Sequence, residues 1–212
     1  MKTALVTGGT CRLGRIIAET LRARGWRVLT SSHRDDAPAD LHADLADPTG
    51  AARLYAELLR LNGGRPPEAL VNNAGLFAGE AETLRTVNFV SPQKLTMLMA
   101  GREAGLGAVV NVLDARVLAE AASGGAYAQS KRELLEFTRK AAAMFSATLR
   151  VNAVAPGPVL LGPATAAVHE PAGETPLGRP TPEAAAEAVA FLLEAPYTTG
   201  AVIPVDGGQW LG

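Results

Sequence analysis

Residues 3–14 read TALVTGGTCRLG, and this stretch decides the fold. A β-prone run at 3–7 leads directly into a glycine-rich turn, and a helical pattern begins at Leu13. Glycines between a strand and a helix let backbone N–H groups approach a pyrophosphate, and the helix N-terminus adds a favourable dipole. The stretch therefore predicts a nucleotide-binding loop, with a merely structural glycine turn as the alternative.

The alternation of strand and helix continues along the chain and predicts a doubly wound α/β domain of the Rossmann type. Short β-branched runs between segments of helical period are typical of a parallel sheet covered on both faces. We expect a single domain over residues 1–212, a seven-stranded sheet and a substrate-side loop at 158–182. The expected strands are 3–7, 26–32, 69–72, 107–113, 148–154 and 201–205, with a short one between 32 and 44; the expected helices are 13–24, 51–61, 84–103, 127–145 and 183–194.

Composition excludes several functional classes. The 212 residues include 20 Lys and Arg against 21 Asp and Glu, for a net charge of −1, and the basic residues are spread along the chain. Neither nucleic acid nor a membrane is therefore expected as a partner. No run approaches the roughly 18 apolar residues of a membrane span, so a cytoplasmic location is expected. Cys11 is the one cysteine, which excludes an intrachain disulfide and a structural zinc site, and no metal is expected.

The end of the second expected strand indicates which dinucleotide is bound. An acidic residue there would accept hydrogen bonds from the adenosine ribose of NAD, whereas a basic residue favours the extra phosphate of NADP. The chain has Ser31-Ser32-His33-Arg34 at this point. Arg34, together with Arg12 of the first loop, can make charge-assisted hydrogen bonds to a 2′-phosphate. NADP is therefore expected, although Asp35 and Asp36 would weaken the positive field if they point inward.

Three residues form a candidate proton-transfer site. Tyr127 and Lys131 are four apart and lie on one face of the expected helix 127–145. An ammonium near a phenol stabilises the phenolate and lowers the pKa of the tyrosine, which can then transfer a proton near neutral pH. Asp114 stands at the end of the preceding strand, where a turn-forming role is the alternative to a chemical one.

Motifs in family order over essentially the whole chain resemble those of the short-chain dehydrogenase/reductase family. They are Thr7-Gly8…Gly14, Asn72-Asn73-Ala74-Gly75, Asn88, Tyr127…Lys131, Pro156-Gly157 and Val205-Asp206-Gly207-Gly208. The resemblance implies that residues 73–75 support the adenosine side of the cofactor and that Asn88 helps to hold a water that relays protons to Lys131. The candidate catalytic residues are Tyr127, Lys131, Asp114 and Asn88; the candidate cofactor-binding residues are Thr7, Gly8, Thr10, Arg12, Leu13, Gly14, His33, Arg34, Asp44, Leu45, Asn73, Ala74, Gly75, Tyr127, Lys131, Pro156 and Gly157.

Two departures from the family pattern are similar to its pteridine-reductase branch. Arg12 stands where the family usually has a third glycine, and Asp114 stands where it usually has a catalytic serine. The branch also has a His-Arg pair that matches His33-Arg34, and an aromatic residue that matches Phe77 and would stack on a pterin ring. The candidate substrate-binding residues are Phe77, Asp114 and Tyr127.

This residue set favours the reduction of a ring C=N bond in a dihydropterin-like substrate by NADPH. The reaction needs a hydride on carbon and a proton on nitrogen, which Tyr127, assisted by Lys131, and Asp114 would deliver. The runner-up is a carbonyl reductase of a 3-oxoacyl thioester or small ketone. Against it, an ionised Asp114 cannot donate the hydrogen bond with which a serine polarises a ketone oxygen. A non-catalytic NADP-binding sensor or scaffold is a third hypothesis.

Two segments are shorter than the family pattern. Between Arg34 and Asp44 there is no room for the usual crossover helix, and only 12 residues separate Gly75 from Asn88. The second segment normally begins a helix that lies near the substrate and contributes to tetramer assembly. The expected partners are a small-molecule substrate and, from the resemblance, further copies of the chain in a homodimer or homotetramer.

Overall fold

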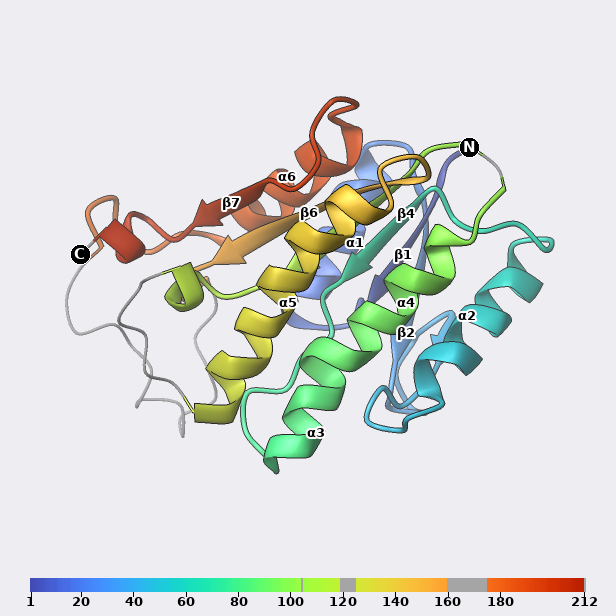
Figure 1. Ribbon diagram of the computed structural model, residues 1–212, viewed down its shortest axis with the longest axis horizontal. Helices are drawn as coiled ribbons and strands as arrows, with labels where there is room; N and C mark the ends of the chain where they lie inside the picture. Colours follow the sequence, from blue (N-terminus) through green and yellow to red (C-terminus); the bar gives the residue numbers. More distant parts are fainter. Residues whose placement is uncertain (104, 119–124, 160–174, 212) are drawn as a thin grey trace.

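In this computed structural model the protein forms a seven-stranded parallel sheet with helices on both faces (Figure 1). The structure describes residues 1–103, 105–118, 125–159 and 175–211. The strand order is β3-β2-β1-β4-β5-β6-β7, so the expected Rossmann-type fold is confirmed. The strands are β1 (Thr3–Thr7), β2 (Arg27–Ser32), β3 (Leu41–His42), β4 (Ala69–Asn72), β5 (Gly107–Val112), β6 (Leu149–Pro156) and β7 (Val202–Val205).

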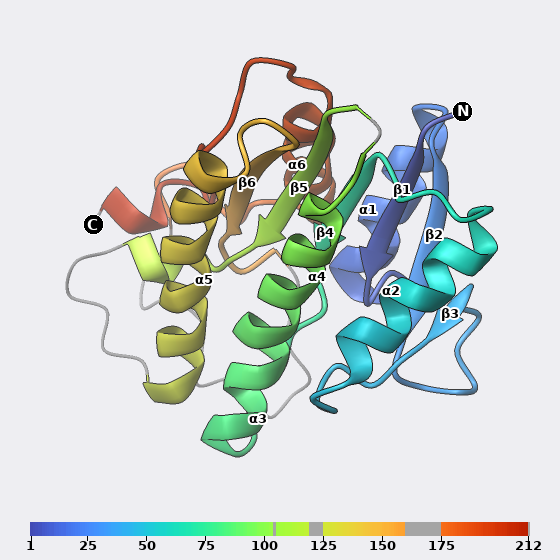
Figure 2. The ribbon, with the colours of Figure 1, turned by 45° about the vertical axis from the view of Figure 1, so that its right-hand side comes forward.

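The helices form two layers, one on each face of the sheet (Figure 2). Side chains alternate between the faces along each strand, so in β1 Ala4 and Val6 pack on one layer and Leu5 on the other. Both faces are buried, which explains why the central strands are continuous apolar runs. One layer holds α1 (Arg12–Ala23) and α6 (Pro182–Glu194); the other holds α2 (Gly50–Leu61), α4 (Ser91–Ala100) and α5 (Gly125–Met144).

The helix expected at 84–103 differs from its prediction. It begins earlier, as α3 (Ala81–Arg85), passes through a π-helical turn, η1 (Thr86–Val90), and ends as α4 at Ala100. Pro92 explains the irregular turn, because it has no N–H to donate to the carbonyl of Asn88 one helical turn earlier. The turn places Asn88 in the interior, where its side chain is fully buried.

The connection from β2 to β3 follows the prediction for a shortened segment. Residues 33–40, all of which the structure describes, contain no helix. Asp40 accepts hydrogen bonds from the N–H of Thr30 at 2.7 Å and from its hydroxyl at 2.8 Å. These bonds fasten the short loop to β2, and the loop carries His33 and Arg34 to the edge of the sheet.

The carboxyl ends of β1, β2, β4 and β5 meet at one edge of the sheet. From β1 the chain continues to β2 on one side and later to β4 on the other, which makes this edge the topological switch point where open α/β sheets bind ligands. Of the expected substrate-side loop at 158–182, residues 160–174 lie outside the described part of the chain. Among the described helices, none has the length and apolar character needed to cross a membrane.

Candidate active site

The turn after β1 packs its backbone tightly against the start of α1. Gly8 has φ +62°, in the left-handed region that favours glycine. A Cβ atom on Gly14 would overlap the carbonyl oxygen of Gly8, so a larger residue does not fit at this position. The turn therefore has the close backbone approach that a pyrophosphate-binding loop requires.

Two side chains hold this turn in place. The hydroxyl of Thr7 accepts hydrogen bonds from the N–H groups of Asn73 and Ala74, each at 3.0 Å. The side-chain amide of Asn73 donates to the carbonyl of Thr7 at 2.9 Å. Thr7 and Asn73 thus join the end of β1 to the end of β4 and set the position of the loop between them.

A cleft of about 670 Å³ runs from the glycine turn to the Tyr127–Lys131 pair. It connects the places where the pyrophosphate and the nicotinamide of a dinucleotide would lie, so the residues present fit such a cofactor. Of the candidate residues, Gly8, Thr10, Arg12, Leu13, Gly14, His33, Arg34, Asp44, Leu45, Asn73, Ala74, Gly75, Phe77, Tyr127 and Lys131 line it; Thr7, Asn88, Asp114, Pro156 and Gly157 are not among its described lining residues.

Pro156 and Gly157 lie at the end of β6 against the turn that follows β7. The N–H of Gly157 donates to the carbonyl of Val205 at 2.9 Å, and a Cβ on Gly157 would lie 2.9 Å from the Cα of Asp206. The two residues therefore support the carboxyl edge of the sheet through their contacts with Val205 and Asp206.

Arg12 has a backbone conformation that favours glycine. It has φ +49°, and it is the one residue other than glycine with positive φ among the residues that the structure describes. This conformation costs a residue with a Cβ atom about 1–2 kcal/mol. The chain thus accepts backbone strain at a position where the exposed guanidinium reaches the cleft.

Arg12→Gly is expected to have two opposite effects: it relieves the backbone strain at position 12 and removes the guanidinium from the cleft. The free energy of unfolding without cofactor should rise by about 1 kcal/mol, because glycine adopts this φ without penalty. The Kd for NADPH should rise about tenfold, because a charge-assisted hydrogen bond to phosphate is lost. Urea denaturation and fluorescence titration measure the two effects. An unchanged Kd would mean that Arg12 does not contact the phosphate groups.

Arg34 is paired with an acidic neighbour. Its Nε donates to Asp36 at 3.0 Å and its Nη2 donates to the second carboxylate oxygen at 2.7 Å. Both side chains are exposed, and both line the cleft. Asp36 thus occupies the guanidinium of Arg34 that was expected to contact a 2′-phosphate, which is the effect expected if an acidic residue points inward.

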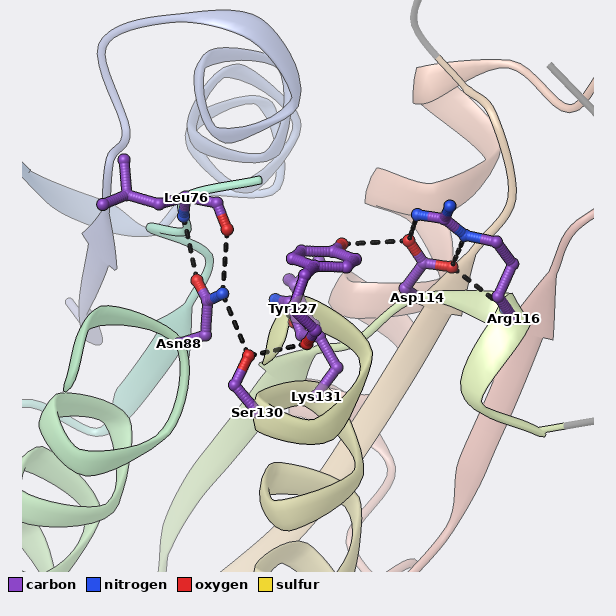
Figure 3. Close-up of polar contacts among 8 residues, drawn as sticks. Leu76, Asn88, Asp114, Arg116, Tyr127, Ser130 and Lys131 are labelled. Carbon is purple, nitrogen blue, oxygen red and sulfur yellow. Dashed lines mark hydrogen bonds and ion pairs between the residues drawn. The ribbon is translucent and has the colours of Figure 1, made fainter. Parts of the chain in front are cut away.

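The catalytic candidates gather where β5 ends and α5 begins. The hydroxyl of Tyr127 donates to Oδ2 of Asp114 at 2.9 Å, and Nζ of Lys131 donates to the carbonyl of Val112 at 2.8 Å. Figure 3 shows the Asp114 carboxylate between the Tyr127 hydroxyl and the guanidinium of Arg116. The structure therefore brings Asp114, Tyr127 and Lys131 together, as the sequence predicted.

Arg116 belongs to this cluster, although no motif in the sequence singled it out. Its guanidinium pairs with Asp114 and lies 5.5 Å from the ring centroids of both Phe77 and Tyr127. The two rings are 4.6 Å apart, at an interplanar angle of 52°. The signal that could have revealed Arg116 is its position two residues after Asp114, at the end of a strand, where a side chain can fold back.

Electrostatics at Tyr127 differ from the expectation. Burial, followed by the Asp114 carboxylate, raises the pKa of Tyr127 above its ordinary value. Burial lowers the pKa of Lys131 to about 8. Burial also acts to raise the pKa of Asp114, but hydrogen bonds and charge from Arg116 outweigh it, so the pKa lies below its ordinary value. The predicted lowering of the Tyr127 pKa is therefore wrong for this geometry, because the phenol is buried and a carboxylate contacts it.

Asn88 holds the backbone next to Phe77. Its side-chain oxygen accepts from the N–H of Leu76 at 2.9 Å, and its amide donates to the carbonyl of Leu76 at 2.8 Å and to the Ser130 hydroxyl at 3.1 Å. Ser130 in turn donates to the carbonyl of Tyr127 at 2.7 Å (Figure 3). Asn88 thus connects the segment that carries Phe77 to the helix that carries Tyr127.

Comparison with known proteins finds likeness along nearly the full chain. The family model described as enoyl-(acyl carrier protein) reductase matches residues 12–209. Protein FixR of Bradyrhizobium diazoefficiens is 32% identical and covers 99% of this chain and 87% of its own length. The 3-oxoacyl-acyl-carrier-protein reductase MabA of Mycobacterium bovis is 30% identical over 100% of this chain and 94% of its own. The structure of FolM alternative dihydrofolate reductase 1 from Brucella suis, in complex with NADP, has a TM-score of 0.84 and is 28% identical; the match covers 100% of this chain and 96% of that one.

Proposed function

The chain belongs to the short-chain dehydrogenase/reductase family of NAD(P)-dependent oxidoreductases, and from this premise we propose that it reduces a C=N bond of a dihydropterin-like substrate with NADPH. The observation that carries the proposal is the Asp114 carboxylate, which accepts the Tyr127 hydroxyl where the family usually has a serine. A carboxylate has no hydrogen to donate to a ketone oxygen. It does accept hydrogen bonds from a tyrosine and from the amino group of a pterin.

Tyr127 is the proton donor in this reaction. The cofactor supplies a hydride when it is bound. As the hydride reaches carbon, the π electron pair of C=N moves to nitrogen, the O–H bond of Tyr127 breaks and an N–H bond forms. The nitrogen is then far more basic than a phenolate, so a tyrosine with a raised pKa still protonates it. Asp114, being ionised, orients Tyr127, and proton delivery no longer needs Asp114 as an acid.

Phe77 supports a flat substrate ring. Its side chain is 42% exposed, lines the cleft and lies against Tyr127. An exposed aromatic ring beside the proton donor suits the stacking of a heteroaromatic ring. The two FolM structures, from Brucella suis and Brucella canis, are described as dihydrofolate reductases in complex with NADP, and a dihydrofolate contains a dihydropterin. Both points support the pterin class of substrate.

A carbonyl reductase is the second candidate, because MabA is named as a 3-oxoacyl-acyl-carrier-protein reductase and is 30% identical. The rate of NADPH oxidation with 7,8-dihydrobiopterin, beside acetoacetyl-coenzyme A, separates the two. We expect turnover of the dihydropterin. Turnover of the thioester alone would overturn the proposal and make Asp114 a tolerated substitution. Activity on neither substrate would favour the third hypothesis, a non-catalytic NADP-binding protein.

Preference for NADPH over NADH is part of the proposal, and it is supported by Arg12 and Arg34 at the cleft. Asp36→Asn is expected to tighten NADPH binding about two- to fivefold, because an exposed ion pair that competes for Arg34 is removed. The Kd of NADH, which has no 2′-phosphate, should not change. Fluorescence titration of both cofactors checks this.

Asp35→Asn is the matched control, since it removes the same charge from the adjacent residue. Equal tightening in both variants would show a general effect of net charge. No tightening in Asp36→Asn would show that Arg34 does not meet the 2′-phosphate. We also propose a homodimer or homotetramer, which light scattering of the purified protein tests.

A further inference from the structure

The side chain of Arg116 holds Asp114 with a fork of hydrogen bonds. Its Nε donates to Oδ1 at 3.0 Å and its Nη2 donates to Oδ2 at 2.7 Å. The backbone N–H of Arg116 also donates to Oδ1, at 2.9 Å. A guanidinium matches both oxygens of a carboxylate in one plane, so this contact fixes orientation as well as charge.

Two aromatic rings also lie near the guanidinium. The Cζ atom of Arg116 lies 5.5 Å from the centroid of Phe77 and 5.5 Å from that of Tyr127. These distances are within the range of cation–π attraction. Arg116 is therefore placed by three residues of the site, and a movement of its side chain would disturb Asp114, Phe77 and Tyr127 together.

The groups that face the Asp114 carboxylate favour its anionic form. They are Arg116, from the 3₁₀ helix η2 (Ala115–Leu118), and Tyr127 and Lys131, from α5. Arg116 and Lys131 are cations, and Tyr127 donates its O–H. The carboxylate is mostly shielded from water, with 16% of its side chain exposed, so these partners replace its hydration.

We propose that Arg116 is a positioning residue for reduction, which fixes the Asp114 carboxylate as an anion against the Tyr127 hydroxyl and so keeps Tyr127 in its protonated form. The consequence is that reduction and oxidation by this site depend differently on pH. Reduction starts from the protonated tyrosine, whereas oxidation of the product starts from the phenolate, which must take a proton from the substrate. A carboxylate 2.9 Å from the phenol oxygen opposes the phenolate by charge repulsion.

Titration of Asp114 tests this inference without any substrate. The carbon-13 NMR shifts of the aspartate carboxyl groups are recorded for the full chain with NADP⁺ as the pH is lowered from neutral. The titration ends at the pH where circular dichroism shows loss of structure. Asp114→Asn assigns the signal. In Arg116→Met the Asp114 midpoint should rise by about 1–3 pH units, because burial remains while the adjacent cation is gone. An unchanged midpoint would overturn the proposal.

Arg85→Met is the matched control. Arg85 also pairs with a carboxylate, that of Glu133, and lies 5.1 Å from the ring of Phe89, but it does not contact Asp114. Its loss should leave the Asp114 midpoint in place; an equal rise in both variants would count against a specific role. If Arg116→Met does not fold, the same titration is made on Arg116→Lys, which keeps the positive charge but cannot form both side-chain hydrogen bonds to the carboxylate. Its midpoint should rise by less, and no rise would contradict the positioning role.

The inference rests on the proposed function only for the identity of the substrate. With 7,8-dihydrobiopterin, the acid limb of the kcat–pH profile should move upward in Arg116→Met together with the Asp114 midpoint. A shifted midpoint with no turnover by the unmodified enzyme would overturn the proposed substrate while leaving the Arg116–Asp114 interaction established. A shifted midpoint with an unshifted kcat profile would show that reduction does not need Asp114 as an anion.

Discussion

Tyr127→Phe is expected to lower kcat for dihydropterin reduction by about 10²–10⁴-fold, the contribution of a positioned proton donor. The phenol is the group that would protonate the substrate nitrogen, and Asp114 would retain its hydrogen bonds from Arg116 in the variant. The ring and its packing on Phe77 also remain. The Kd of NADPH should therefore change little. Stopped-flow absorbance of NADPH measures the rate of the reductive step directly.

Tyr197→Phe is the control for this prediction. Tyr197 is fully exposed on the surface, and the substitution removes the same hydroxyl oxygen as Tyr127→Phe. Its kcat should equal that of the unmodified protein. A kcat for Tyr127→Phe within threefold of the unmodified enzyme would exclude Tyr127 as the donor. A loss of NADPH binding equal to the loss of rate would instead assign Tyr127 to cofactor binding.

Asp114→Ser is expected to exchange one substrate class for the other. Reduction of the dihydropterin should fall by about 10²-fold, because the variant loses the anion that orients Tyr127. Reduction of acetoacetyl-coenzyme A should rise, because the serine hydroxyl can donate to the developing negative charge on a ketone oxygen. The ratio of the two kcat/KM values is the measurement.

The same variant has a predicted pH dependence. Burial and Asp114 both raise the pKa of Tyr127, so removal of the carboxylate lowers that pKa toward its ordinary value. Oxidation of an alcohol, which needs the phenolate, should therefore begin at lower pH in Asp114→Ser. Asp47→Ser is the control, since Asp47 likewise accepts hydrogen bonds from a hydroxyl and an arginine, those of Thr49 and Arg53, but it does not contact Tyr127. An unchanged substrate ratio in Asp114→Ser would contradict the pterin proposal.

Much of the fold could be predicted because its signals are local. The sequence predicts the strands at 3–7 and 69–72 with their observed bounds, and it predicts the glycine-rich turn between the first strand and the following helix. Such patterns depend on backbone conformation and on neighbours within one helical turn. The helix at 84–103 was placed less well, because the apolar period does not reveal the π-helical turn that Pro92 induces.

By itself, the sequence determined the parallel α/β fold, the nucleotide loop and the Tyr127–Lys131 pair, because each follows from residues close together in the chain. Only the tertiary structure decided what those residues contact. Arg116 meets Phe77 and Tyr127 because the ends of β4 and β5 and the start of α5 converge at one edge of the sheet. The pKa of Tyr127 is raised for the same reason. Burial of the phenol, and then the Asp114 carboxylate that folding brings to it, favour the protonated form, and spacing along the helix reveals neither of them.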